Sequence, residues 1–205
     1  MEKKQIIIAM AAIVLVTIIV SFLIMQKRKR TLMNLAEALV RRDFKHFDQM
    51  ISSDKIRKSL PAFNLDYLNL NRALLEKDTR KIDECFQVFD SVNLNASQKR
   101  EIALSGFAYY LGRKDKEKCH HYLEMMENSN VSEKIKAESR EYYEVLFEKK
   151  TDGLDRLLAE TEKLPEKERG PNEYLISVIY ENLNDRKKAD EYRKLSAEHA
   201  GKETK

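Results

Sequence analysis

The chain has 205 residues, of which 38 are Lys or Arg and 34 are Asp or Glu, and its formal net charge is +4. Residues 1–30 hold six basic groups and one acidic group, so residues 31–205 carry 32 basic against 33 acidic groups and a net charge of −1. Residues 31–205 are so close to neutral that they lack the positive electrostatic field that binding to nucleic acid requires. The low counts of five Gly, three Pro and two Cys exclude collagen-like, proline-rich and disulfide-framework proteins.

The first predicted element is a membrane anchor within residues 1–30. Residues 6–25 form an apolar run whose polar members are Thr17 and Ser21, and a helix of this length matches a bilayer core of about 30 Å. A cleaved signal peptide is the alternative, but its apolar stretch is roughly 7 to 15 residues long and precedes a cleavage site. The sequence therefore predicts a single-pass helix in the cell membrane, followed by a basic cluster of Lys27, Arg28, Lys29 and Arg30.

The distribution of basic residues predicts the orientation of this anchor. Lys and Arg are retained on the cytoplasmic side, and more of them follow the apolar run than precede it. This places residues 31–205 in the cytoplasm. Lys3 and Lys4, before the run, weaken the contrast and leave an extracytoplasmic position as the alternative.

Apolar residues recur at helical spacing throughout the rest of the chain. Positions 82, 85, 86 and 89 fall at i, i+3, i+4 and i+7, and so do positions 119, 122, 123 and 126 and positions 154, 157, 158 and 161. Turn-forming segments separate these stretches, at Pro61, at residues 93–95, at residues 128–130 and at residues 165–171. The predicted class is all-α, without a strand-period segment of useful length.

Aspartates at regular intervals indicate an internal repeat. Asp43, Asp78, Asp115, Asp152 and Asp185 are separated by 35, 37, 37 and 33 residues, and each stands at a predicted turn between two helices. The repeating unit is a helix, a turn carrying Asp, and a second helix that packs back on the first. Five such hairpins are expected at residues 31–60, 62–94, 96–130, 132–165 and 171–199, followed by a disordered tail at 200–205.

Residues 106–112, with the sequence Gly-Phe-Ala-Tyr-Tyr-Leu-Gly, resemble the first helix of a tetratricopeptide repeat. Residues 177–192 resemble the same repeat more closely, through Ser177, Tyr180, Ala189 and Tyr192. Residues 31–94 share only the period and the apolar stripe, and Asp152 lacks the small or apolar residue that follows the other aspartates at the fourth position. The resemblance implies an α-solenoid over residues 31–199.

The resemblance also implies a function. In this family the first helices of the hairpins line a concave groove that holds a peptide or a partner helix. The candidates for this groove are Asn69, Arg72, Phe107, Tyr110, Tyr174 and Glu181.

Residue patterns for other chemistry are missing. The five glycines form no phosphate-binding loop motif. His120 and His121 are adjacent, so on a helix their side chains point in different directions and do not coordinate the same metal ion. Cys85 and Cys119 are expected in the core as free thiols. We therefore expect no enzymatic activity, no cofactor and no metal.

Together these features predict a scaffold or adaptor that recruits a membrane- or secretion-associated protein partner to the membrane. The alternative is an extracytoplasmic, membrane-tethered helper of protein export or envelope assembly. The oligomeric state stays open.

Overall fold

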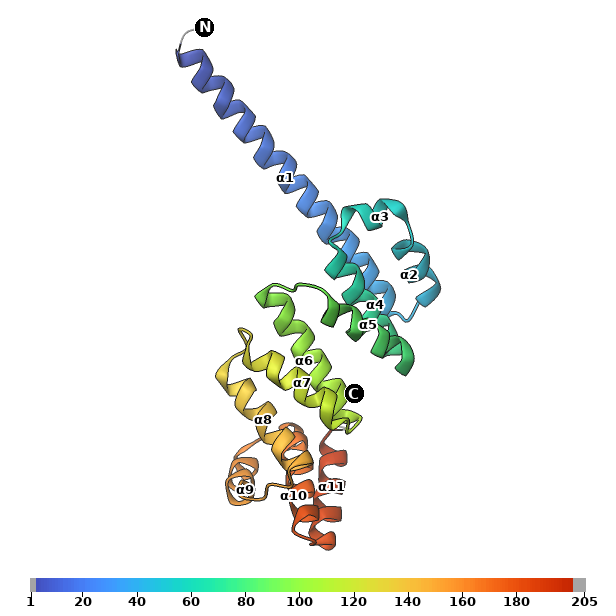
Figure 1. Ribbon diagram of the computed structural model, residues 1–205, viewed down its shortest axis with the longest axis vertical. Helices are drawn as coiled ribbons and strands as arrows, with labels where there is room; N and C mark the ends of the chain where they lie inside the picture. The colour runs from blue at the N-terminus through green and yellow to red at the C-terminus, as the bar shows by residue number, and fades with distance from the viewer. Residues whose placement is uncertain (1–2, 201–205) are drawn as a thin grey trace. The chain divides into compact units, whose positions relative to one another are not determined.

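The computed structural model describes the backbone of residues 3–200 and the side chains of residues 20–200. Regular structure in this part of the chain is entirely helical, which confirms the predicted all-α class (Figure 1). The helices are α1 (Lys3–Val40), α2 (Phe44–Ile51), α3 (Asp54–Ser59), α4 (Ala62–Glu76), α5 (Thr79–Ser91), α6 (Ala96–Gly112), α7 (Lys116–Glu127), α8 (Glu133–Phe147), α9 (Leu154–Lys163), α10 (Gly170–Asn182) and α11 (Arg186–Ala200), with a 3-10 turn at Glu166–Glu168.

The chain divides into two compact units, Met1–Asn93 and Leu94–Lys205. In the first unit, the end of α1 pairs with α2, and α4 pairs with α5. In the second unit, α6 pairs with α7 and α10 with α11, while α8 precedes α9. Four helix pairs thus lie close to predicted hairpins, whereas α9 packs chiefly on α10 and not back on α8. An α-solenoid-like arrangement of helical hairpins is supported at this coarse level.

The turn after the first helix of each hairpin has a common backbone conformation. Its left-handed residue has φ between 56° and 63°, and the residues concerned are Arg42, Lys77, Lys114, Lys149 and Asn184. In four of the turns the next residue is an Asp whose N–H donates to a carbonyl five positions earlier, as Asp43 does to Ala38 at 2.9 Å. These bonds satisfy carbonyls that the end of the helix leaves free.

The same aspartates begin the second helices. The side chain of Asp115, for example, accepts a hydrogen bond from the N–H of Lys118 at 3.1 Å, and Asp43, Asp78 and Asp185 make the equivalent bond. Asp152 lies in the turn between α8 and α9 as predicted, but it caps no helix, because α9 begins after Gly153.

Each unit has its own apolar core. In the first, Leu35 and Leu39 of α1 pack with Phe47, Leu60 and Leu68. In the second, Val145 and Leu157 pack with residues of α10, among them Ile176 and Ile179. Most residues of the predicted apolar stripes are buried, among them Ile82, Phe86, Cys119 and Leu157.

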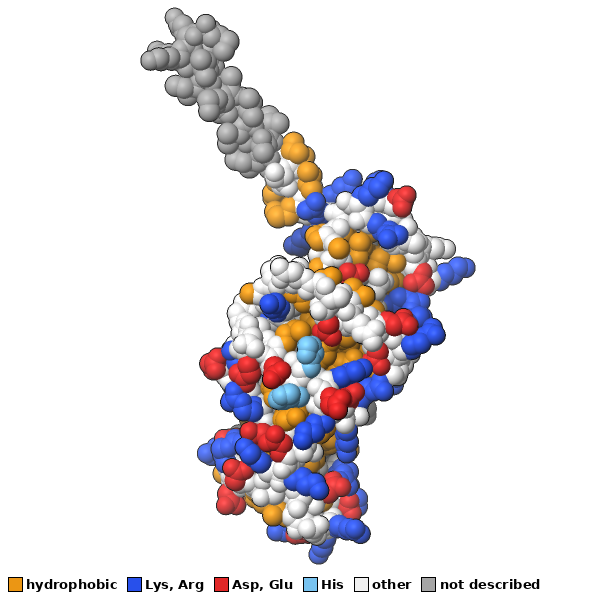
Figure 2. Space-filling view, in the orientation of Figure 1, with side chains coloured by type: hydrophobic (Ala, Val, Ile, Leu, Met, Phe, Trp, Pro, Cys, Tyr) orange, Lys and Arg blue, Asp and Glu red, His pale blue; other side chains and the backbone are white. Residues whose placement is uncertain are grey.

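The predicted membrane anchor is corrected. The part of the chain that the structure describes contains no helix long and apolar enough to cross a membrane, so the predicted span at residues 6–25 is wrong there. The backbone instead continues as one helix, α1, through the basic cluster and into the first core, where Leu35 and Leu39 are buried. The side chains at positions 1–19, which include most of the predicted run, lie outside the described residues. Within residues 20–25, all side chains except Ser21 are hydrophobic and exposed (Figure 2).

Candidate functional site

Two adjoining hollows in the first unit form the candidate site. They have volumes of about 450 and 340 Å³, and Asp66 and Asn69 of α4 line both of them. The larger hollow is also lined by Asp48, Arg72, Ala73, Lys81, Glu84, Cys85 and Val88. The smaller one is also lined by Ile51, Ser52, Arg57, Ala62 and Leu65. We call the two together the α4 groove.

Helical periodicity explains why one helix supplies the floor of this groove. Asp66, Asn69 and Ala73 follow one another at intervals of three and four residues, so they share a face of α4. Leu68 and Leu70, between them, are buried. α4 therefore presents Asp66 and Asn69 to the groove, together with Leu65, while Leu68 and Leu70 face the interior.

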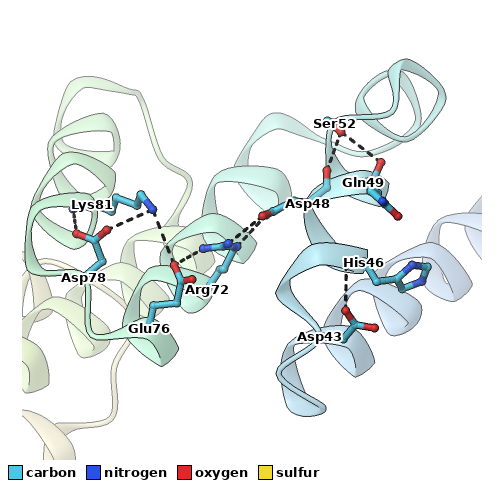
Figure 3. Close-up of polar contacts among 9 residues, drawn as sticks. All are labelled: Asp43, His46, Asp48, Gln49, Ser52, Arg72, Glu76, Asp78 and Lys81. Carbon is cyan, nitrogen blue, oxygen red and sulfur yellow. Dashed lines mark hydrogen bonds and ion pairs between the residues drawn. The ribbon is translucent and has the colours of Figure 1, made fainter.

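Arg72 ties α4 to α2 across the larger hollow (Figure 3). Its Nη2 donates to Oδ2 of Asp48 at 2.8 Å, and its Nη1 donates to Oε2 of Glu76. Its Nε is buried without a hydrogen-bond partner among the described residues, although it lies 2.8 Å from Oδ1 of Asp48. The guanidinium also lies over the ring of Phe44, 5.1 Å from its centroid.

These contacts reinforce the positive charge that the guanidinium carries at physiological pH. Burial disfavours the charged form of Arg72, but hydrogen bonds and charges from Asp48 and Glu76 outweigh burial and raise its pKa. Arg72 is therefore a fixed cation that holds two elements together. The positive charge of Arg72 is therefore already balanced by the carboxylates of Asp48 and Glu76 when a ligand enters the groove.

Lys81 of α5 lies beside the same network (Figure 3). Its Nζ lies 3.2 Å from Oδ2 of Asp78 and 3.9 Å from Oε2 of Glu76. The backbone N–H of Lys81 and its side chain lower the pKa of Asp78, the residue that begins α5. Lys81 thus both contacts Asp78, the N-cap of α5, and lines the larger hollow of the groove.

Asp66 and Asn69 differ from these residues because they have no partner. Neither side chain forms a hydrogen bond or an ion pair with another described residue. Partial burial raises the pKa of Asp66, without an opposing cation to lower it. An amide that can both donate and accept therefore lies one turn from an uncompensated carboxylate.

The sequence predicted that Cys85 lies in the core. It lines the larger hollow instead. Burial, followed by the charges of Asp66 and Glu84, raises the pKa of its thiol, so the thiol stays protonated at neutral pH. Cys119 is in the core as predicted, where burial and then Asp115 raise its pKa to about 12. Both cysteines are free.

The α4 groove contains two of the six predicted groove residues, Asn69 and Arg72. Phe107 and Tyr110 are instead buried on α6, where they are 6% and 2% exposed. Tyr110 stacks on Tyr122 at 5.6 Å between ring centroids, and Gly106 leaves room for the Tyr122 ring. The aromatic pair fills the space between α6 and α7.

Tyr174 and Glu181 line a separate hollow of about 350 Å³ in the second unit. Glu181 is exposed and accepts a hydrogen bond from Nη2 of Arg193 at 3.0 Å. The predicted basic cluster, Lys27, Arg28, Lys29 and Arg30, is exposed on α1.

Sequence reasoning missed Asp66, although a signal for it was present. Asp66 precedes Asn69 by three residues, so it lies on the same helical face as this predicted groove residue. No group of His, Cys, Asp and Glu suited to a metal ion occurs among the residues with described positions. The groove offers hydrogen-bonding and charged groups, which suit recognition of a polar segment.

Comparison with protein-family models, with curated proteins and with solved structures finds no match to this chain.

Proposed function

We propose that the chain is a non-enzymatic, tetratricopeptide-like adaptor that binds a protein partner through the α4 groove. The observation that carries the proposal is the pair of unused polar side chains, Asn69 and Asp66, in two adjoining hollows. Polar groups that the folded chain leaves without partners are available to a ligand. An extended or helical peptide supplies main-chain and side-chain groups at the required spacing.

The rigidity of the walls supports this proposal. Arg72 fixes α4 to α2 through Asp48, so the opening between these helices is held by an ion pair in addition to the apolar core. A preformed groove binds a flexible segment with less loss of conformational entropy than a loose one. Helical hairpins that pack into such a surface are a common architecture for protein recognition.

Site-specific photocrosslinking in cells tests the proposal. A photoreactive amino acid replaces Asn69 in the full chain, and a matched variant carries it at Asn71, which lies on the same helix but lines neither hollow. We expect a protein that crosslinks from position 69 and not from position 71. Purified partner should then bind the Asn71→Ala chain normally and the Asn69→Ala chain about tenfold more weakly.

Two outcomes would contradict this function. Identical crosslinked species at both positions would mean that the groove has no selectivity, and absence of any crosslink from position 69 would mean that it has no occupant. Circular dichroism of both alanine variants serves as the folding control. Asn69 is exposed, so its replacement should leave the helical signal unchanged.

A further inference from the structure

Asp66 lies where the two hollows of the α4 groove meet, since it lines both. It differs in this position from the other charged residues around the larger hollow. Each of those takes part in an ion pair: Asp48, Arg72, Lys81 and Glu84. Asp66 alone among these lining residues has no oppositely charged partner within the described structure.

The surroundings of Asp66 favour a cation as the missing partner. Its carboxyl group is partly removed from water, and no described cation or hydrogen-bond donor compensates this loss. Arg57 lines the smaller hollow but forms no ion pair with Asp66. The bases of the larger hollow, Arg72 and Lys81, are already paired with carboxylates, so an anionic ligand would find no free positive charge there.

We propose that Asp66 binds a Lys or Arg side chain of the partner segment that occupies the α4 groove, while the Asn69 amide bonds to the main chain of that segment. This inference rests on the proposed function, because it assumes that a polypeptide fills the groove. It adds that the groove selects segments that carry a Lys or Arg opposite Asp66. A charge-assisted hydrogen bond in a partly buried position discriminates strongly against a neutral residue.

The preference can be measured before the natural partner is known. A phage-displayed library of random peptides is selected on the full chain, and one binding peptide is synthesised with and without its basic residue, which norleucine replaces. We expect Lys or Arg to be enriched at one peptide position. Replacement with norleucine should weaken binding to the wild-type chain about tenfold and binding to the Asp66→Asn chain much less.

Glu84→Gln is the matched control for Asp66→Asn. Both substitutions remove one negative charge from residues lining the same hollow, but Glu84 is exposed and paired with Arg80 at 3.6 Å. A specific interaction requires Asp66→Asn to weaken binding of the basic peptide and Glu84→Gln to change it less than twofold. Equal losses for the two variants would attribute the effect to overall charge and overturn the inference.

The thiol of Cys85 reports where the peptide binds. It lines the larger hollow, whereas Cys119, the second cysteine of the chain, is buried. Bound peptide should slow alkylation of Cys85 by iodoacetamide in the full chain, and an unchanged rate would place the peptide elsewhere and overturn the inference.

The outcomes separate the two proposals. Peptides that protect Cys85 but show no basic preference would overturn the role of Asp66 and leave the groove as a binding site. If no peptide binds and no protein crosslinks from position 69, both proposals are wrong. Thermal unfolding of Asp66→Asn should show a midpoint no lower than that of the wild type, because the substitution removes an uncompensated charge.

Discussion

Glu173 of α10 and His199 of α11 form a buried polar pair in the second unit. Nδ1 of the imidazole lies 2.7 Å from Oε2 and 3.0 Å from Oε1 of the carboxylate. The two side chains are 4% and 9% exposed. Close by, Oγ of Ser196 donates to the carbonyl of Gly170 at 2.8 Å, so polar bonds join the last turn of α11 to the first turn of α10.

His199→Ala should destabilise the second unit by about 1–3 kcal/mol, because it leaves the buried Glu173 carboxyl group without its hydrogen-bond partner. Replacing both residues, with Glu173→Leu and His199→Leu, should reduce that loss, since neither polar group is then left without a partner. Urea unfolding followed by circular dichroism measures both effects. His46→Ala, at an exposed histidine, is the control and should change the free energy of unfolding by no more than about 0.5 kcal/mol. Equal losses from His199→Ala and the double variant would contradict this explanation.

Two glycines of α6 provide a matched test of packing. An added Cβ on Gly106 would lie 2.6 Å from Cγ of Tyr122, whereas one on Gly112 would have no neighbour within 4 Å. Gly106→Ala should therefore destabilise the chain by about 1–3 kcal/mol through overpacking. Gly112→Ala should stabilise it by about 0.5–1 kcal/mol, because alanine restricts the unfolded chain and favours the helix. Thermal unfolding that ranked the two variants in the opposite order would refute the assigned packing of α6 on α7.

The left-handed turn residues predict a gain in stability. Lys77 has φ of 57°, a conformation that strains a residue with a Cβ but not glycine. Lys77→Gly should therefore raise the free energy of unfolding by about 1 kcal/mol, while Lys77→Ala should not. Asn184→Gly should gain less, because Asn tolerates this region better than Lys does. Chemical denaturation of the three variants makes the comparison, and a gain for Lys77→Ala would argue against backbone strain as the cause.

Local patterns in the sequence were sufficient to predict the helical hairpins. Asn95 and Gln98, for instance, form a reciprocal capping box at the start of α6, directly after the turn predicted at residues 93–95. The turns were predicted for the same reason. Asp78 and Asp115 act within three residues of their own positions, so the signal is local in the sequence.

The burial of the predicted groove residues on α6 depends on contacts distant in the sequence. Phe107 and Tyr110 lie on the helix expected to line a groove, but which face of α6 is buried depends on how α7 packs against it, with Tyr122 stacked on Tyr110. Helical spacing alone places residues on a face without saying what covers that face. The bond between Arg72 and Asp48 spans 24 positions, and that between His199 and Glu173 spans 26. No local pattern could have paired these residues.

The first unit should show two opposite dependences of stability on pH. Burial raises the pKa of Asp66 above its ordinary value of 3.8, so the folded state binds its proton more tightly than the unfolded state does. The contribution of Asp66 to stability therefore falls as the pH rises from 3.8 through the raised pKa. Asp66→Asn should be at least as stable as the wild type at neutral pH, and any advantage should disappear as the pH falls through this window.

Asp78 should behave in the opposite sense. Hydrogen bonds from the backbone and side chain of Lys81 lower its pKa below 3.8, so its contribution is present above 3.8 and is lost as the pH falls through the lowered value. Asp78→Asn keeps a side chain that can cap α5 but does not titrate, so it should remove this loss. Urea midpoints of the wild type and both variants between about pH 3 and pH 7 make the comparison. If the wild-type and Asp78→Asn midpoints ran parallel throughout that range, the hydrogen bonds from Lys81 could not be favouring the charged form of Asp78 in the folded chain.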